Sequence, residues 1–535
     1  MDVQKAYDTV KWRVLEDIPS EMNFPPQFIR WIMLCVSTVS YRYMINGQTS
    51  RILKAKRGIR QGDPISPLLF VIVMEYLHRS LTKLHNQPEF KYHPKCGKMR
   101  ITNICFADDL IMFARGDNAS VQSMMEEFHR FSEATGLYAN PTKCNVYFGG
   151  VPDTIQQQIL VTTKFSVGKL PFKYLGVPLA SRKLAIYQYE PLIDKIVSRI
   201  RHWAAKLLSY AGRLQLIKSV LFTTTNYWMQ VFLIPKKVLH NIEAICRTFL
   251  WAGTDIISRK SPIAWDKVCY TKAAGGQNVT SLLEWNLATI SKLLWNLQAK
   301  EDKLWIKWMD HYYIKGQQVM EWQVKANCSW ILRKIMQCRE RVQQTAYWPL
   351  AVQSQKYTTA RMYRELRGPQ LDVTWKHLIY YNYARPRARF TLWMALLNRL
   401  ATKDRIARFG VNTNGECCWC KQVETLDHIF FECTTTGFVW SNVLTWLGYN
   451  RTPEYWSREK EWISDKTKKK GWKSQLLKIA TTETVYEVWR NRNDITFGHN
   501  TTGTIENRIK NNIVTRGSMH RKIGDHIDIY SLSII

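Results

Sequence analysis

The sequence predicts an α+β domain at the N-terminus, followed by a long helical region and a small metal-binding module. Short strand-like apolar runs alternate with helical ones over roughly the first 150 residues, as in α+β domains. From about residue 183 to residue 250, apolar residues recur at helical spacing, for example at Ile196, Ile200 and Trp203. Cysteines and a histidine gather between residues 417 and 433. A chain of 535 residues has room for roughly two to four such domains.

The composition indicates a globular protein with a polyanionic partner. Hydrophobic residues make up 46% of the chain, which excludes an intrinsically disordered protein. Lys and Arg total 76 against 43 Asp and Glu, which gives a net charge of +33. Such an excess of positive charge is most often found in proteins that bind nucleic acid. A basic, merely solvated surface is the competing interpretation. The 22 Trp and 25 Tyr residues could stack on unpaired bases, although most are expected in the core.

No targeting or membrane segment is predicted. Asp2 follows Met1 directly, without a signal-peptide pattern, and the longest apolar stretch, residues 68–74, is too short to span a bilayer. We therefore expect a reducing intracellular compartment, where clustered cysteines usually bind metal instead of forming disulfides.

Two local patterns organise the N-terminal domain. Asp8 is placed to cap a helix that continues through Leu15, and Pro64 and Pro67 bracket a turn that should open another helix. Residues 101–112 indicate two short strands that meet at an acidic tip, Ala107-Asp108-Asp109.

The adjacent aspartates at this tip suggest a metal site. Asp108 and Asp109 repel each other unless a cation lies between them, and Asp2 offers a third carboxylate. Phosphoryl transfer by two metal ions needs carboxylates that hold the ions about 4 Å apart. Taken alone, however, an Asp-Asp pair in a loop is more often a solvated turn.

Five segments change that balance, because together they resemble the motifs of reverse transcriptases from non-LTR (LINE-type) retrotransposons of the plant type. They occur in the order and at the spacing of motifs A to E: Asp2-Val3-Gln4-Lys5-Ala6-Tyr7-Asp8, then Arg57-Gly58-Ile59-Arg60-Gln61-Gly62-Asp63-Pro64-Ile65-Ser66-Pro67, then Phe106-Ala107-Asp108-Asp109, then Gly136-Leu137 with Asn140 and Lys143, and finally Tyr174-Leu175-Gly176-Val177-Pro178. The resemblance implies a right-hand polymerase palm, an antiparallel sheet with helices, and a helical thumb.

The resemblance also implies roles for the carboxylates. Asp2 and Asp108 would hold two Mg²⁺ ions, with Mn²⁺ able to replace them, and Asp109 would be a third, less essential carboxylate. The backbone carbonyl of Val3 would complete one coordination shell. Asp8 would cap a helix and would not bind metal.

The remaining site residues follow from the same resemblance. Tyr7 would be the steric gate that excludes a ribose 2′-hydroxyl, with an ordinary core tyrosine as the alternative. Gln61 and Gly62 would lie at the incoming nucleotide, where glycine lets the backbone approach closely. Lys143 would protonate the leaving pyrophosphate, with a surface lysine as the alternative.

The cysteine cluster predicts a structural zinc site. Cys417, Cys420, His428 and Cys433 offer three thiolates and an imidazole in the pattern Cys-x2-Cys-x7-His-x4-Cys, which suits four-coordinate Zn²⁺. Cys418 could replace Cys417, and the spacing leaves both open. The flanking residues resemble the zinc-binding domain that follows plant non-LTR reverse transcriptases.

These patterns give an expected division of the chain into five parts. They are a palm at 1–180, a thumb-like helical region at 181–255, a helical connector without an assigned role at 256–360, a zinc-binding domain at 361–445, and a basic linker with a C-terminal helical tail at 446–535. Because motif A stands at the start, we expect the fingers, which hold the nucleotide triphosphate, and an endonuclease to be encoded upstream.

Two interpretations of function remain open. The chain is either an RNA-directed DNA polymerase that uses an RNA template, a DNA primer or target and dNTPs, or a catalytically inactive relic that binds nucleic acid through its basic surface and zinc module. Without fingers, we expect negligible polymerase activity from the isolated chain. A nuclear location is expected from the ancestry, because integration takes place on chromosomal DNA.

Overall fold

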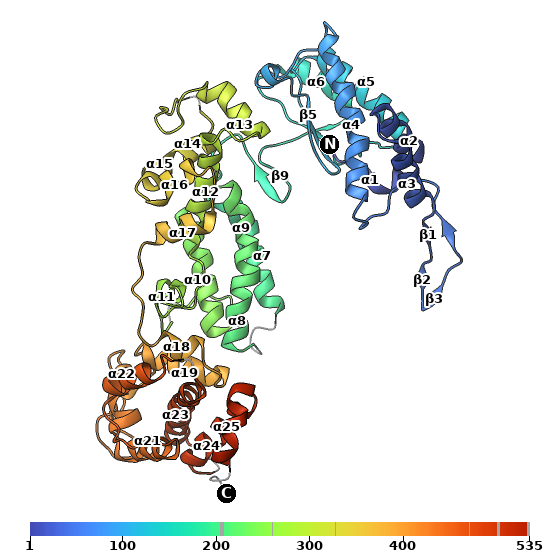
Figure 1. Ribbon diagram of the computed structural model, residues 1–535. Helices are drawn as coiled ribbons and strands as arrows, with labels where there is room; N and C mark the ends of the chain where they lie inside the picture. Colours follow the sequence, from blue (N-terminus) through green and yellow to red (C-terminus); the bar gives the residue numbers. More distant parts are fainter. Residues whose placement is uncertain (204–207, 259–260, 327, 470, 500–502, 532–535) are drawn as a thin grey trace. The chain divides into compact units, whose positions relative to one another are not determined.

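The computed structural model describes residues 1–203, 208–258, 261–326, 328–469, 471–499 and 503–531 (Figure 1). It is rich in helices and has small two-stranded sheets, which confirms a mixed helix and strand fold. The chain divides into two compact units, Met1–Leu184 with Asn296–Trp330, and Ala185–Trp295 with Ile331–Ile535. Residues of the expected connector, 256–360, therefore belong to both units.

The first unit is built around the helix α4 (Ser66–Lys83), which begins between the two prolines of the predicted turn and has Pro67 in its first turn. Its residues Phe70, Val73 and Leu77 are almost fully buried, whereas Leu68 and Val71 lie on the exposed side. The surrounding helices are α1 (Ala6–Thr9), α2 (Trp12–Glu21), α3 (Pro26–Ser37), α5 (Asn118–Thr135) and α6 (Asp153–Thr163). Packing of α2 and α5 against α4 forms the core of this unit.

The expected cap at Asp8 is wrong. Asp8 lies inside the short helix α1, and the cap positions of α1 and α2 are Lys5 and Lys11, neither of which makes a side-chain cap hydrogen bond. The chain turns at Val10, which is fully buried, so tertiary packing ends α1 before a longer helix can form.

Strand pairing in this unit is confined to short segments. The predicted hairpin is present as β5 (Asn103–Phe106) and β6 (Asp109–Met112). In the described residues the strands form separate pairs and not a continuous antiparallel sheet. The other antiparallel pairs are β1 (Ser40–Tyr41) with β4 (Leu53–Lys54), β2 (Met44–Ile45) with β3 (Gln48–Thr49), and β9 (Phe172–Tyr174) with β10 (Val177–Leu179). The strands β7 (Asn145–Val146) and β8 (Ser166–Val167) form a parallel pair. The predicted sheet is thus reduced to strands of two to four residues.

Part of the expected connector packs on the first unit. The helix α13 (Leu304–Met309) continues into a π-helical turn, η6 (Asp310–Ile314). The indole Nε1 of Trp308 donates a hydrogen bond of 2.8 Å to the carbonyl of Lys95. The amide of Lys98 donates to the hydroxyl of Tyr312 at 3.3 Å. This segment therefore belongs to the N-terminal fold and does not act as a free linker.

The second unit begins with the predicted run of helices. They are α7 (Glu190–His202), α8 (Tyr210–Leu216), the π-helical turn η5 (Ile217–Leu221), α9 (Phe222–Val231) and α10 (Lys236–Ala252). After α11 (Trp265–Cys269) the chain is irregular and passes through Gly275 and Gly276 before α12 (Leu282–Gln298). Glycine is required at position 276, because a Cβ there would collide with the backbone carbonyl of Tyr270. The helices α14 (Trp330–Gln337), α15 (Arg339–Gln343), α16 (Tyr347–Gln353) and α17 (Thr359–Arg367) follow.

The C-terminal helices surround one central helix, α23 (Trp472–Phe497), as Figure 1 shows. They are α18 (Lys376–Tyr380), α19 (Pro386–Leu396), α20 (Lys403–Ala407), the π-helical turn η7 (His428–Glu432), α21 (Thr434–Trp446), α22 (Trp456–Lys466), α24 (Ile505–Ser518) and α25 (Arg521–Ser531). The segment expected as a basic linker and tail is instead part of this packed body. Lys466 ends α22, Thr467 is fully buried, and Lys470 lies outside the described residues. Within the described residues, no helix is long and apolar enough to cross a bilayer.

Candidate catalytic and metal-binding sites

Backbone pairing brings the three predicted aspartates together at the tip of the β5–β6 hairpin, where Asp108 lies in the turn between the two strands. Asp2 forms an antiparallel bridge with Asp109, the first residue of β6. The amide of Val3 donates to the carbonyl of Asp108 at 3.4 Å, and the amide of Asn140 donates to the carbonyl of Asp2 at 2.9 Å. Motifs A, C and D, which are far apart in sequence, therefore meet at the tip of the β5–β6 hairpin.

The carboxylates at this tip repel one another. Burial raises the pKa of Asp109, the negative charges of Asp108 and Asp2 raise it further, and the positive charge of the Met1 amino group partly offsets them. The same environment raises the pKa of the Cys105 thiol to about 11, through burial and then the charges of Asp108 and Asp109. A cation at this tip would relieve the repulsion.

The donor set fits Mg²⁺, although the side chains do not form a closed shell. Carboxylate oxygens are the ligands that Mg²⁺ prefers. In the part of the chain that the structure describes, however, Cys417, Cys420, His428 and Cys433 are the one group of three or more possible ligand residues whose ligand atoms gather closely enough to hold an ion. The aspartates are thus neighbours through their backbones, and their oxygens would have to turn toward a common ion.

Lys143 also lies at this site. Its Nζ is 3.5 Å from Oδ2 of Asp2, with the lysine side chain 67% exposed and the aspartate 30%. The ammonium partly neutralises the carboxylate, but solvent screens so exposed a pair. The predicted lysine is therefore brought to the predicted aspartate, from a turn that follows Asn140.

Motif B lies against motif A. The amide of Ile59 donates to the carbonyl of Tyr7, and the amide of Gly58 donates to the carbonyl of Val10, both at 2.7 Å. Gly58 has φ +87°, and a Cβ on it would lie 2.8 Å from the carbonyl oxygen of Asp8. Prediction from the sequence did not assign Gly58 a role; its place in motif B was the available signal.

Of the three residues predicted to bind the nucleotide, two are exposed and one packs on the core. Gln61 and Gly62 are exposed, and Gly62 has φ +90° with open space around its Cα. The ring of Tyr7 stacks on Phe70, with 5.2 Å between the ring centroids, and packs on the core of the first unit. This contact fits the alternative of a core tyrosine as well as a ring held rigidly for a steric gate.

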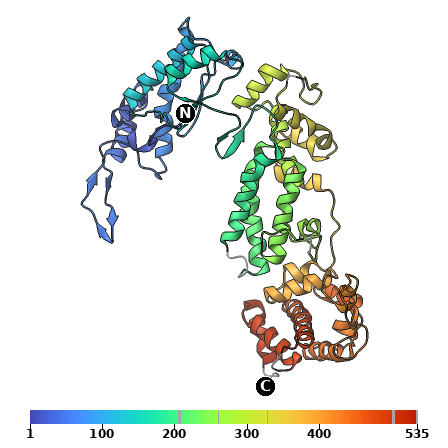
Figure 2. The ribbon, with the colours of Figure 1, turned by 180° about the vertical axis from the view of Figure 1, so that it is seen from behind.

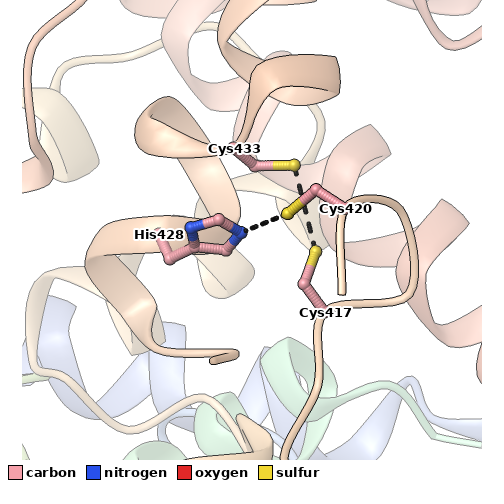
Figure 3. A group of neighbouring side chains, drawn as sticks. All are labelled: Cys417, Cys420, His428 and Cys433. Atoms are coloured by element: carbon pink, nitrogen blue, oxygen red, sulfur yellow. Dashed lines mark hydrogen bonds between the residues drawn. The ribbon is translucent and has the colours of Figure 1, made fainter. Parts of the chain in front are cut away.

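The four predicted zinc ligands converge in the second unit (Figure 3). Their ligand atoms all lie within 4.8 Å of one another. The sulfurs of Cys417 and Cys433 are 3.9 Å apart, and the sulfur of Cys420 is 3.0 Å from Nε2 of His428. Zn–S bonds of about 2.3 Å in a tetrahedron place two sulfurs roughly 3.8 Å apart, so the set fits one zinc ion. Cys418 is not among the four residues of the cluster, so the geometry favours Cys417 of the two that the spacing left open.

Local structure explains how the ligands meet. The amide of Cys417 donates to the carbonyl of Gln422 at 2.6 Å, which closes the loop that also carries Cys420. His428 begins the turn η7, and Cys433 stands at its end, immediately before α21. Cys417, His428 and Cys433 are buried, as expected for a structural metal that is closed to solvent.

A buried ion pair beneath the zinc loop was not predicted. The carboxylate of Glu424 receives two hydrogen bonds from the guanidinium of Arg492, of 3.1 and 2.5 Å, and one of 2.8 Å from the amide of Lys403. The amide of Glu424 in turn donates to the carbonyl of Gly415 at 2.8 Å. The helix α23 therefore supports the loop from 68 residues away, and no local pattern in the sequence signals this.

Comparison with known proteins supports two of these regions directly. Residues 1–179 match the family described as reverse transcriptase (RNA-dependent DNA polymerase), and residues 357–440 match the family described as zinc-binding in reverse transcriptase.

Individual relatives agree with these matches. The chain is 31% identical over 141 residues to a protein of Arabidopsis thaliana whose name includes the words ribonuclease H protein, covering 26% of this chain and 23% of that one. It is 30% identical over 178 residues to a retrovirus-related Pol polyprotein from the type-1 retrotransposable element R2 of Nasonia vitripennis, covering 33% and 16%. A Pol polyprotein from the same type of element in Popillia japonica is 24% identical over 259 residues, covering 46% and 40%.

The chain thus spans well under half the length of these relatives. The motifs and the converging aspartates agree with the family match over residues 1–179, and the cysteine cluster agrees with the match over residues 357–440. Residues 1–179 form a domain of the reverse transcriptase family, and a reverse-transcriptase zinc-binding domain lies C-terminal to it, in a chain related to the Pol polyproteins of R2-type retrotransposable elements.

Proposed function

We propose that this chain carries the catalytic centre of an RNA-directed DNA polymerase of a non-LTR retrotransposon. The observation that carries the proposal is the meeting of Asp2, Asp108 and Asp109 at the tip of the β5–β6 hairpin within the reverse transcriptase domain. RNA template, DNA primer or target and dNTPs would be its partners, and the nucleus its location. The proposed reaction forms a bond between the primer 3′-oxygen and the α-phosphorus of the dNTP and breaks the bond to pyrophosphate.

In this proposal the aspartates hold the metal ions. Asp2 and Asp108 would bind two Mg²⁺ ions, which lower the pKa of the primer hydroxyl and neutralise the developing charge on the phosphates. Asp109 would be the third, less essential carboxylate and would add negative charge beside the two ions. Lys143, now beside Asp2, is close enough to the same centre to donate a proton to the leaving pyrophosphate.

Other parts of the chain would position the substrates. Tyr7, held by its stack on Phe70, would lie under the sugar, and the open space at Gly62 would admit the nucleotide. The helices α7 to α10 would follow the duplex as a thumb, and the zinc domain would hold RNA or target DNA.

A second candidate is nucleic-acid binding without catalysis. The observation that favours it is that the carboxylate oxygens of the three aspartates are not gathered into a shell, whereas the zinc ligands are. The two candidates differ in whether the aspartates bind Mg²⁺ or Mn²⁺.

Metal binding tests this difference directly. The full chain, saturated with zinc first, is titrated with Mn²⁺ and free Mn²⁺ is followed by electron paramagnetic resonance. Asp108→Asn should weaken Mn²⁺ binding at least about tenfold, because it removes a charged ligand. The matched control is Asp153→Asn, an exposed aspartate at the start of α6, which should leave the titration unchanged. Equal binding by the wild type and Asp108→Asn would contradict the proposed metal site.

Primer extension on an RNA template tests the reaction itself. Extension with Mg²⁺ that disappears in Asp108→Ala supports the polymerase. Extension that survives in Asp108→Ala contradicts the assigned roles. Binding of template and primer without extension is expected of both candidates when the fingers are encoded upstream, and the Mn²⁺ titration then decides between them.

A further inference from the structure

A two-stranded arm leaves the end of α3, and along it only Val39, Ser50 and Ala55 are half-buried. It comprises residues 38–57, with β1 paired to β4 near its base and β2 paired to β3 at its tip. Every residue of these four strands is exposed. Figures 1 and 2 show from two sides that the arm extends away from the helices of the first unit. We call it the basic arm.

The basic arm exposes apolar side chains that a solvated hairpin does not need. Tyr43 is 56% exposed and Met44 75%, and Tyr41, Ile45, Ile52 and Leu53 are exposed too. An isolated two-stranded hairpin is marginally stable in water, and contiguous exposed apolar residues usually mark an interaction site. A partner that covers these residues is therefore expected.

Charge identifies the class of partner. Residues 22–62 contain seven Lys and Arg residues and no Asp or Glu: Arg30, Arg42, Arg51, Lys54, Lys56, Arg57 and Arg60. All seven are exposed. In the described chain, no carboxylate forms an ion pair with any of them. The surface therefore fits a polyanion, and it repels an equally basic second copy of this chain.

Exposed rings accompany the cations. Tyr41 and Tyr43 lie on the basic arm, and Trp31, 56% exposed, lies on the outer side of α3, opposite the buried Ile29, Ile32 and Val36. Rings on a charged groove bind unpaired bases by stacking, whereas in a duplex the bases are already stacked on one another. Cations alone would serve a duplex equally well, so the rings favour a single strand.

We propose that the basic arm binds an unpaired stretch of the RNA template, with Tyr41 and Tyr43 stacking on bases and Arg51 and Lys54 contacting phosphates. This assignment to the template rests on the proposed polymerase function. The arm follows α3 and ends at Arg57, the first residue of motif B, and the next two amides, of Gly58 and Ile59, donate to the carbonyls of Val10 and Tyr7. A strand held on the arm is thereby tethered to the fold that carries the aspartates.

Fluorescence anisotropy with the full chain tests the role of the rings. The probes are a short unstructured RNA and an RNA–DNA hybrid duplex of the same length, without nucleotide or added Mg²⁺. Tyr41→Ala/Tyr43→Ala should bind the RNA about thirtyfold or more weakly, because it removes two rings on which bases stack, and should bind the hybrid as the wild type does. Tyr41→Phe/Tyr43→Phe keeps the rings and should bind RNA like the wild type.

A second variant changes charges and keeps the rings, so it tests the proposal even if removing the rings unfolds the arm. Arg51→Gln/Lys54→Gln should lower the slope of log affinity for RNA against log salt by roughly 1.4, from about 0.7 for each lost phosphate contact. The matched control is Lys83→Gln/Lys91→Gln, two exposed lysines of the first unit outside the arm, which should leave this slope unchanged.

Three outcomes would overturn the proposal. They are unchanged RNA binding by both arm variants, an equal loss of RNA and hybrid binding in the alanine variant, or a change in the sedimentation of the chain with RNA binding intact, which would make the arm a protein contact. Because no catalysis is measured, these outcomes are independent of the Mn²⁺ titration and primer extension that test the polymerase.

Discussion

The buried pair Arg492–Glu424 is expected to control both the stability of the zinc domain and its hold on the metal. The side chain of Arg492 is 4% exposed and that of Glu424 0%, with a closest N–O distance of 2.5 Å. Arg492→Met removes the guanidinium and keeps a long apolar side chain. The carboxylate of Glu424 then stays buried. It loses both hydrogen bonds from the guanidinium and keeps the one from the Lys403 amide.

The magnitude follows from this burial. Removing one partner of a buried pair costs about 3–5 kcal/mol, because the other charge stays out of water. That is a large part of the roughly 5–15 kcal/mol by which domains are stable. The double variant Glu424→Gln/Arg492→Met should cost less than the sum of the two single variants, because neither charge is left unpaired.

The pair also supports the loop that carries Cys417 and Cys420, because the Glu424 amide closes the base of that loop on Gly415. Loosening this support should lower zinc affinity by about tenfold to a hundredfold, as is typical when residues behind a metal ligand are changed.

Zinc release to a chromogenic chelator, followed along a urea series, reports on this domain locally within the full chain. Arg492→Met should release zinc at a clearly lower urea concentration than the wild type. The matched control is Arg490→Met on the same helix, whose partner Asp494 lies 3.8 Å away and whose side chain is 51% exposed. That change should cost about 0.5 kcal/mol or less. If Arg492→Met released zinc like Arg490→Met, the assignment of the pair as the support of the loop would be wrong.

Three further predictions concern the metal, the pH and the core. Cys417→Ser should lose bound zinc, measured by atomic emission, whereas Cys418→Ser should retain it, because Cys418 lies outside the cluster; equal retention would contradict the ligand set. Burial raises the pKa of Glu243 above its ordinary value of 4.5, so the folded chain keeps a proton that the unfolded chain has released, and the unfolding free energy falls as the pH rises from 4.5 toward the raised pKa. Glu243→Gln keeps an acceptor for the Leu282 amide, which donates to Oε1 of Glu243 at 3.0 Å. This variant should remove the fall, so its urea midpoint should exceed that of the wild type at neutral pH and equal it in acid. Phe70→Ala should destabilise the first unit by about 3–5 kcal/mol in urea unfolding, since Phe70 is 1% exposed and carries the Tyr7 stack; a loss under 1 kcal/mol would indicate that the core closes over the gap.

Several elements were predictable because their signal is local. The proline turn before α4, the acidic hairpin of β5 and β6, and the helices from Glu190 onward each follow from residues that are close in sequence. The zinc ligands were equally accessible, since all four lie within 17 consecutive positions, Cys417 to Cys433.

Other features depend on contacts between distant residues and left no local pattern. Asp8 has the side chain of a helix cap, but burial of Val10 ends α1 first. Trp308 belongs to a connector without an assigned role, yet its indole binds the carbonyl of Lys95, 213 residues earlier. The last helices appeared to form a tail, because the basic run at Lys466 is typical of linkers.

The sequence by itself determined the family, the order of the motifs and the identity of the residues able to hold metals, because these depend on residue type and spacing. The tertiary structure decided which of them meet. It bridges Asp2 to Asp109, leaves Cys418 outside the zinc cluster, and places Arg492 beneath the zinc loop. The physical reason is that backbone pairing and the burial of charge act between residues far apart in the chain, where composition and periodicity carry no information.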